Sequence, residues 1–126
     1  MLANEITRES IEKMVISFYI KVLQDETVGP FFIAKLGDDM KNDHWEQHLE
    51  LLINFWSSMT LGDASYSGNP FAPHTQLGEL TREVFEQWLV LFFKTIDEVY
   101  ESHAGNEFKE RSMAIAGNFM RNLRIT

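Results

Sequence analysis

Apolar residues recur at steps of three and four positions along most of this chain, and that period constrains its fold more than any other feature. An α-helix turns once in about 3.6 residues, so residues spaced this way line up along one side of a helix. The chain is therefore predicted to be all-α. Each such set of mainly apolar residues is called a stripe, and the sequence has four. Their residues are Ile11, Met14, Val15, Phe18 and Val22; Trp45, His48, Leu49, Leu52, Phe55, Trp56 and Met59; Phe85, Trp88, Leu89, Phe92, Ile96, Val99 and Tyr100; and, in a weaker fourth set, Phe108, Ile115, Phe119 and Leu123.

Short polar residues mark where three of these helices should begin. Thr7 and Thr81 stand directly before the first and third stripes, where a hydroxyl can accept a hydrogen bond from the exposed N–H groups of the first turn. Asp43 stands before the Trp45 stripe, with Glu46 three residues later, and is expected to cap that helix in the same way.

Glycines and prolines mark the expected breaks. The segment "ETVGPFFIAKLGDD" should form a short apolar turn, and Gly105 with Asn106 should separate the last two helices. Residues 60–80 hold five glycines and prolines and are expected to be irregular. An irregular stretch of that length in so small a domain suggests either a functional segment or a missed helix. His74 lies in it, directly after Pro73, which stiffens the backbone there; a lone loop histidine, however, most often has no special role.

Length and charge exclude several classes of protein. The 126 residues suit a single domain, 1–126. A net charge of −8, from 11 basic and 19 acidic residues, argues against partners such as nucleic acid or an anionic membrane surface. The absence of cysteine excludes disulfides and thiolate ligands, and suits a reducing compartment. With no signal peptide and no apolar run of about 18 residues, the protein is expected to be cytoplasmic.

Common catalytic and metal motifs are missing from the sequence. In "HWEQH", His44 and His48 are four residues apart as in a zinc-binding helix, but Glu46 is at the wrong position for a general base and there is no third ligand. None of the four histidines has a glutamate three positions earlier, as a di-iron bundle requires. Phosphate-binding glycine loops and G-x-S-x-G elbows are also lacking.

Three polar aromatic side chains stand on or beside apolar helical faces. Tyr19, His48 and Trp88 lie in three different predicted helices and carry an O–H, an imidazole and an indole N–H. Taken singly, each is a common core residue with its polar tip satisfied locally. Together they could converge on one apolar pocket, which is the usual form of a ligand site.

A larger pattern resembles a known family. "FY" at 18 and 19, "GPFF" at 29–32, "HWEQHLELLINFW" at 44–56, "PHTQL" at 73–77 and "FEQWLVLF" at 85–92 are similar in order and spacing to the truncated haemoglobins. The third group is the closest match, because the chain lacks the paired-glycine motifs of the first two. The resemblance covers nearly the whole chain and implies a truncated globin-like two-over-two helical sandwich around a haem.

The resemblance also implies roles for individual residues. His74 would be the metal ligand, bound to the haem iron on the proximal side. Tyr19 and Trp88 would be distal hydrogen-bond donors, and Trp88 would also contact the haem. The other cofactor-binding residues would be Phe32, Leu52 and Trp56.

His48 has two readings within this resemblance. It would act either as a third distal donor or as a gate at the pocket mouth, with Trp45 one turn earlier on the solvent side. The gate is preferred, because Tyr19 and Trp88 already crowd one small ligand.

The implied cofactor is haem b, and the implied partners are the diatomic gases O2, CO and NO. Strong distal donors slow ligand release, which suits oxygen, peroxide or nitric oxide chemistry better than transport. Redox turnover would need a separate reductase, because the sequence has no flavin or nicotinamide motif. Two alternatives are a haem-based gas sensor, which ordinarily carries an output domain, and a cofactor-free helical interaction module.

Overall fold

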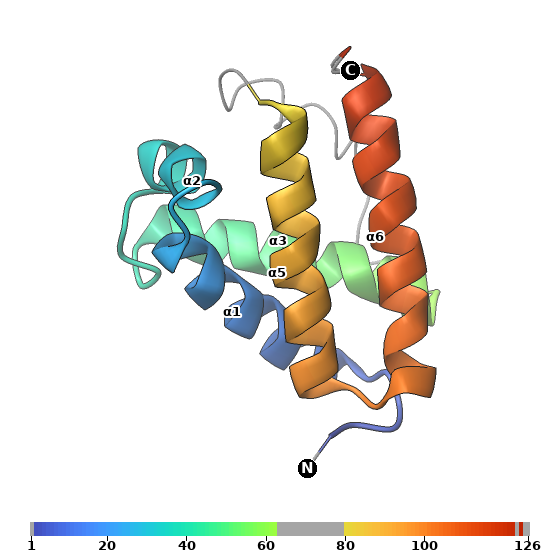
Figure 1. The fold of residues 1–126 in the computed structure, drawn as a ribbon. Helices are drawn as coiled ribbons and strands as arrows, with labels where there is room; N and C mark the ends of the chain where they lie inside the picture. Colours follow the sequence, from blue (N-terminus) through green and yellow to red (C-terminus); the bar gives the residue numbers. More distant parts are fainter. Residues whose placement is uncertain (1, 63–79, 123, 125–126) are drawn as a thin grey trace.

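The computed structural model of the protein describes residues 2–62, 80–122 and 124, and within them it is all-α. Five helices are described in these ranges (Figure 1), and no strand beyond a single bridge between Ala3 and Tyr100. The prediction of an all-α chain is confirmed. The helices are α1 (Arg8–Gln24), α2 (Gly29–Leu36), α3 (Asp43–Leu61), α5 (Arg82–Val99) and α6 (Ser102–Asn122).

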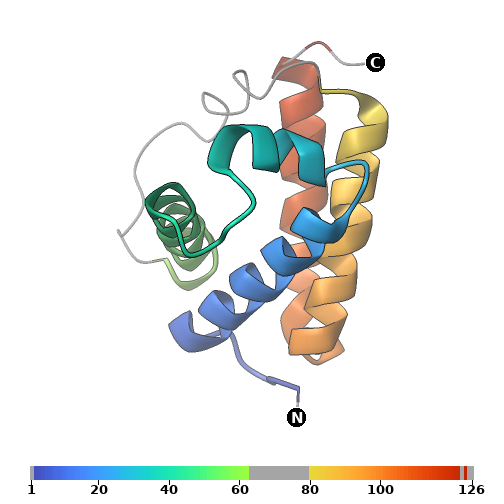
Figure 2. The same ribbon diagram turned by 90° about the vertical axis from the view of Figure 1, so that its left-hand side faces the viewer.

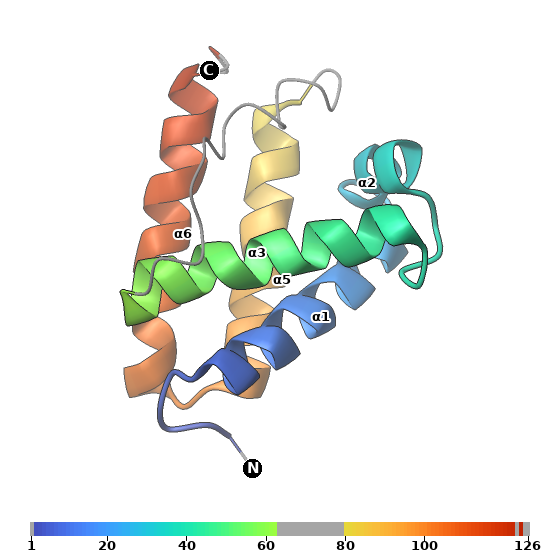
Figure 3. The same ribbon diagram turned by 180° about the vertical axis from the view of Figure 1, so that it is seen from behind.

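The helices form two crossed layers. α5 and α6 run side by side in one layer, and α1 and α3 cross them in the other, as the front and back views show (Figures 1 and 3). α1 packs against α2, α3 and α5, so it is the central helix of the fold. The side view places the short helix α2 above α1, on the side from which α5 begins (Figure 2). This is the predicted two-over-two sandwich.

Two of the three predicted helix starts are confirmed. The Ser10 N–H donates to the Thr7 hydroxyl at 3.0 Å, and the Val84 N–H donates to the Thr81 hydroxyl at 3.4 Å. The third prediction was wrong by one residue, because the cap of α3 is Asn42, whose side-chain oxygen accepts from the Trp45 N–H at 2.9 Å. Asp43 is instead the first helical residue, where a carboxylate faces the positive end of the helix dipole.

The segment predicted to be a short apolar turn is the helix α2. Pro30 stands in its first turn, where a missing N–H costs nothing, and Gly37 ends it with a φ of 87°. Gly29 lies so close to α1 that a Cβ there would be 2.7 Å from the carbonyl oxygen of Val22. The glycine and proline therefore shape a helix entry rather than prevent a helix.

The predicted break at Gly105 and Asn106 is also wrong. α6 begins at Ser102 and contains both residues. A Cβ at Gly105 would be 2.6 Å from Cγ2 of Ile96, so the missing side chain lets α6 approach α5. The real break is at residues 100 and 101, where the Ala3 N–H donates to the Val99 carbonyl oxygen and the Glu101 N–H donates to the Ala3 carbonyl oxygen, each at 2.9 Å.

The first two residues of the stretch predicted to be irregular are helical instead. α3 continues through Thr60 and Leu61 and ends at Gly62, whose φ of 73° suits glycine. Residues 63–79, which include His74, lie outside the described part of the chain.

The predicted stripes supply most of the core. All five residues of the α1 stripe are buried, and so are Phe85, Phe92, Ile96, Val99 and Tyr100. On α3, Trp45 and Trp56 are buried, whereas the stripe residues between them are only partly covered. No described helix is long and apolar enough to cross a membrane.

Candidate functional site

Tyr19 is the centre of an aromatic cluster that joins three helices. It lies on α1 with only 3% of its surface exposed. Its ring meets Phe32 of α2 at 5.4 Å, Trp45 of α3 at 5.4 Å and His48 of α3 at 5.0 Å between centroids, all edge to face. The structure therefore brings together three residues that the sequence predicted for one site, namely Tyr19, Phe32 and His48.

The Tyr19 hydroxyl has no hydrogen-bond partner among the described residues. Burial raises the pKa of this hydroxyl far above its ordinary value, so it keeps its proton at neutral pH. The Nε2 atom of His48 is buried beside the same cluster. The hydroxyl is not among the fully covered polar atoms that the described part of the chain leaves without a partner, so it is available to water or to a small polar ligand.

Trp45 does not lie on the solvent side of His48, so that prediction was wrong. Its side chain is fully buried, and its Nε1–H donates to the carbonyl oxygen of Gly37 at 2.7 Å. That bond ties the start of α3 to the end of α2. Because its only donor is used there, Trp45 supports the cluster but has no N–H left for a ligand.

Trp88 lies on α5 in a second group of rings. It stacks on Phe92 at 5.4 Å with an angle of only 6° and meets Phe18 edge-on at 5.5 Å. No residue of the described ranges accepts a hydrogen bond from its Nε1–H. Phe18 also touches Tyr19 at 4.9 Å, so the two ring groups form one continuous aromatic wall.

The two other predicted contact residues lie on α3. Trp56 is buried and also stacks on Phe92, at 5.3 Å and 16°. Leu52 is half-buried and packs against the core one turn earlier on the same helix.

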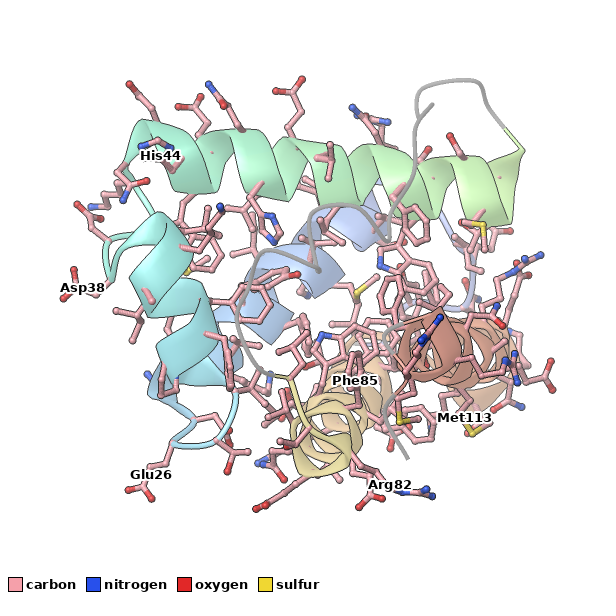
Figure 4. All side chains as sticks on the ribbon, turned by 90° about the horizontal axis from the view of Figure 1, so that it is seen from above. Glu26, Asp38, His44, Arg82, Phe85 and Met113 are labelled. Carbon is pink, nitrogen blue, oxygen red and sulfur yellow. The ribbon has the colours of Figure 1, made fainter. Side chains whose placement is uncertain are left out.

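An apolar pocket opens between α2, α5 and α6. Two predicted residues line it, Phe32 and Trp88, whereas Leu52 and Trp56 do not. Seen from above, Phe85 lies on the inner side of α5, and Arg82 lies at the outer edge (Figure 4). The lining residues that sequence reasoning missed are Val28, Phe31, Leu80, Val84, Phe85 and Phe119. Helical spacing could have found Val84 and Phe85, which stand one turn before Trp88.

A hydrogen-bonded pair ties two walls of this pocket together. One oxygen of the Asp25 carboxylate accepts from the side-chain amide of Gln87 on α5 at 2.8 Å. The other oxygen accepts from the backbone N–H groups of Thr27 and Val28, at 3.0 and 2.8 Å, just before α2. Nothing in the sequence pattern pointed to this pair, because its members are distant in the chain.

The predicted metal ligand, His74, lies outside the described residues and stays a prediction. In the part of the chain that the structure describes, no group of three or more histidine, aspartate or glutamate side chains could hold a metal ion.

Comparison with known proteins identifies the family. The group 3 truncated haemoglobin ctb of Campylobacter jejuni is 36% identical over 119 residues, which make up 94% of this chain and 92% of that protein. The chain belongs to the group III truncated haemoglobins. The crystal structure of the group III truncated haemoglobin from Campylobacter jejuni matches this globin with a TM-score of 0.89 and 35% identity, over 98% of this chain and 95% of that one. No protein-family model matches the chain.

The residues of this truncated haemoglobin suit a haem group. A porphyrin is a flat, largely apolar ring, and the pocket is lined by aliphatic and aromatic side chains. The O–H of Tyr19 and the N–H of Trp88 are two donors that no described residue uses, and both rings contact Phe18. An apolar wall with a few unused donors beside it is what a haem with a small polar ligand requires.

Proposed function

We propose that this globin binds haem b in the pocket between α2, α5 and α6 and binds the diatomic ligands O2, CO and NO at the haem iron. The observation that carries this proposal is the apolar lining of that pocket, which includes Phe32 and Trp88, with the protonated Tyr19 next to Phe32 at 5.4 Å between ring centroids. Family membership supports the cofactor and disfavours a cofactor-free interaction module.

The roles of the residues follow from their positions and from the family resemblance. His74 is proposed as the proximal iron ligand, on the resemblance alone. Phe32 and Trp88 contact the haem from the pocket wall, which is supported by their place in its lining. Leu52 and Trp56 extend that apolar surface along α3.

Haem iron supplies a site for small gases and one-electron chemistry. The chain's own contribution is hydrogen bonding to a ligand that gains negative charge. The Tyr19 O–H and the Trp88 N–H are proposed to donate to it, each bond being worth about 1.5–3 kcal/mol because the acceptor is charged. His48 is proposed as a gate beside them.

These donors hold a polar ligand firmly, so slow release follows. We therefore propose turnover of oxygen, peroxide or nitric oxide rather than transport, with electrons from a separate reductase. The chain is proposed to act as one domain in the cytoplasm, which its lack of cysteine supports.

The test is the visible absorption spectrum of the purified protein, compared with that of His74→Gly. The wild-type protein is expected to retain haem with a five-coordinate ferrous spectrum, and the variant to lose haem or to need added imidazole to restore that spectrum. Haem retention with an unchanged ferrous spectrum in His74→Gly would show that another group binds the iron.

A further inference from the structure

A row of five aromatic rings leads from the pocket to the far end of α5. It begins at Trp88 in the pocket lining, which stacks on Phe92 at 5.4 Å, and Trp56 also stacks on Phe92, at 5.3 Å. Trp56 meets Phe108 of α6 at 5.4 Å, and Phe108 stacks on Tyr100 at 5.0 Å. The row therefore begins at Trp88 in α5 and ends at Tyr100, the residue that follows α5; this helix runs from top to bottom in Figure 1.

The last ring of the row has a route for its proton. The Tyr100 and Ser10 hydroxyl oxygens are 2.7 Å apart, and the Ser10 hydroxyl donates to the Thr7 carbonyl oxygen at 2.9 Å. The Ser10 proton is therefore committed to Thr7, and the Tyr100 O–H donates to Ser10. Tyr100 itself is only 2% exposed, whereas Ser10 is half-buried and reaches solvent.

The row combines stacked and edge-to-face contacts, both of which are usual in protein cores. Trp88 and Trp56 both lie nearly parallel to the ring of Phe92, at 6° and 16°. Tryptophan and tyrosine give up an electron far more readily than phenylalanine. Trp88, Trp56 and Tyr100 are therefore the redox-active residues of the row, and Phe92 and Phe108 lie between them.

We propose that this row passes oxidising equivalents from the haem pocket to Tyr100, so that the protein survives reaction with peroxide; the inference rests on the proposed haem binding. Reduction of one hydrogen peroxide breaks its O–O bond and takes two electrons and two protons to give two molecules of water; bound haem would supply the centre at which this reduction occurs. Tyr100 is oxidised twice in this turnover, and each time one electron passes by way of Trp56 and Trp88.

At each oxidation Tyr100 loses its hydroxyl proton through Ser10 to solvent and becomes a neutral tyrosyl radical. The two protons released in this way match the two that peroxide takes up from solvent. Each time, one molecule of a phenolic or ascorbate-type reductant in solution returns one electron and one proton to Tyr100, so two such molecules reduce one peroxide to two molecules of water. Tyr19 is a poorer end point, because no described residue accepts its proton.

The experiment uses the haem-loaded ferric protein, mixed with an equimolar amount of hydrogen peroxide and frozen for electron paramagnetic resonance. The wild-type protein should give a tyrosyl signal, and this signal should be lost in Tyr100→Phe and in Trp56→Phe. Both substitutions keep an aromatic ring in the row but replace a side chain that is readily oxidised with one that is not. Trp45→Phe is the control, because it replaces a buried tryptophan outside the row, and it should keep the signal.

Two further measurements make every outcome decisive. A nitroso spin trap followed by mass spectrometry should place its adduct on Tyr100, and the change in haem absorption should show that each variant still reacts with peroxide. If haem binds and reacts but wild type forms no tyrosyl radical, or Tyr100→Phe keeps it, the relay is wrong although the proposed function stands. If no haem binds, the proposed function fails first.

Discussion

Removing the hydroxyl of Tyr19 should leave the stability of the haem-free chain nearly unchanged but weaken ligand binding in the haem-loaded protein. Tyr19 and Tyr100 form a matched pair for this test, because both rings are buried and each loses one oxygen on replacement by phenylalanine. They differ in one respect. The Tyr100 hydroxyl is bonded to Ser10, whereas no described residue bonds the Tyr19 hydroxyl.

The sizes of the two stability changes follow from that difference. The Tyr19 hydroxyl has no described partner to lose, so Tyr19→Phe should change the free energy of unfolding of the haem-free chain by less than about 0.5 kcal/mol. Tyr100→Phe removes a satisfied hydrogen bond and should lower it by about 1 kcal/mol. Both variants keep the aromatic ring, so the contribution of ring packing to the free energy of unfolding should change little in either.

The functional cost of Tyr19→Phe appears only with a polar ligand. Losing one hydrogen bond to a charged acceptor should accelerate oxygen dissociation by about 10- to 100-fold, which corresponds to about 1.4–2.7 kcal/mol. Bound carbon monoxide is less polar, so its dissociation should change less.

Urea unfolding of the haem-free chains and stopped-flow ligand dissociation from the loaded ones measure both effects. The reasoning is refuted if Tyr19→Phe destabilises the haem-free chain as much as Tyr100→Phe does. Equal acceleration of oxygen and carbon monoxide release would instead point to a steric effect of the Tyr19 hydroxyl.

Three further predictions concern the pocket and the core. His48→Leu should change the association rate of carbon monoxide more than the dissociation rate of oxygen, and a cycle with Tyr19→Phe should give a coupling below about 0.5 kcal/mol; stronger coupling would make His48 a donor. Gln87→Met, which removes the bond to Asp25, should speed haem transfer to an acceptor globin by up to about tenfold, and an unchanged rate would mean that the pair does not hold the pocket walls. Burial raises the pKa of Tyr100 from 10.0 to about 12, so between these pH values the unfolded chain releases a proton that the folded chain keeps; stability should fall there, and less steeply in Tyr100→Phe.

Local rules predicted the helices well where the deciding contacts are local. The stripe of α1 and the caps at Thr7 and Thr81 depend on residues within one turn, and all were confirmed. The break at Gly105 was wrong because a glycine in a helix costs only about 1 kcal/mol, which close packing against Ile96 offsets. A sequence pattern does not reveal which glycine ends a helix and which lets two helices touch.

The site shows the same division between local and distant causes. Spacing placed Trp45 and His48 on one face of α3, and the structure agrees that both touch Tyr19. Spacing could not tell which donors remain available, because the Trp45 N–H is used by the carbonyl oxygen of Gly37, at the end of another helix. The Tyr19 O–H has no such acceptor in the described ranges. Two side chains of the same cluster thus have opposite capacities for a ligand, and the difference is set by where α2 ends rather than by either aromatic residue.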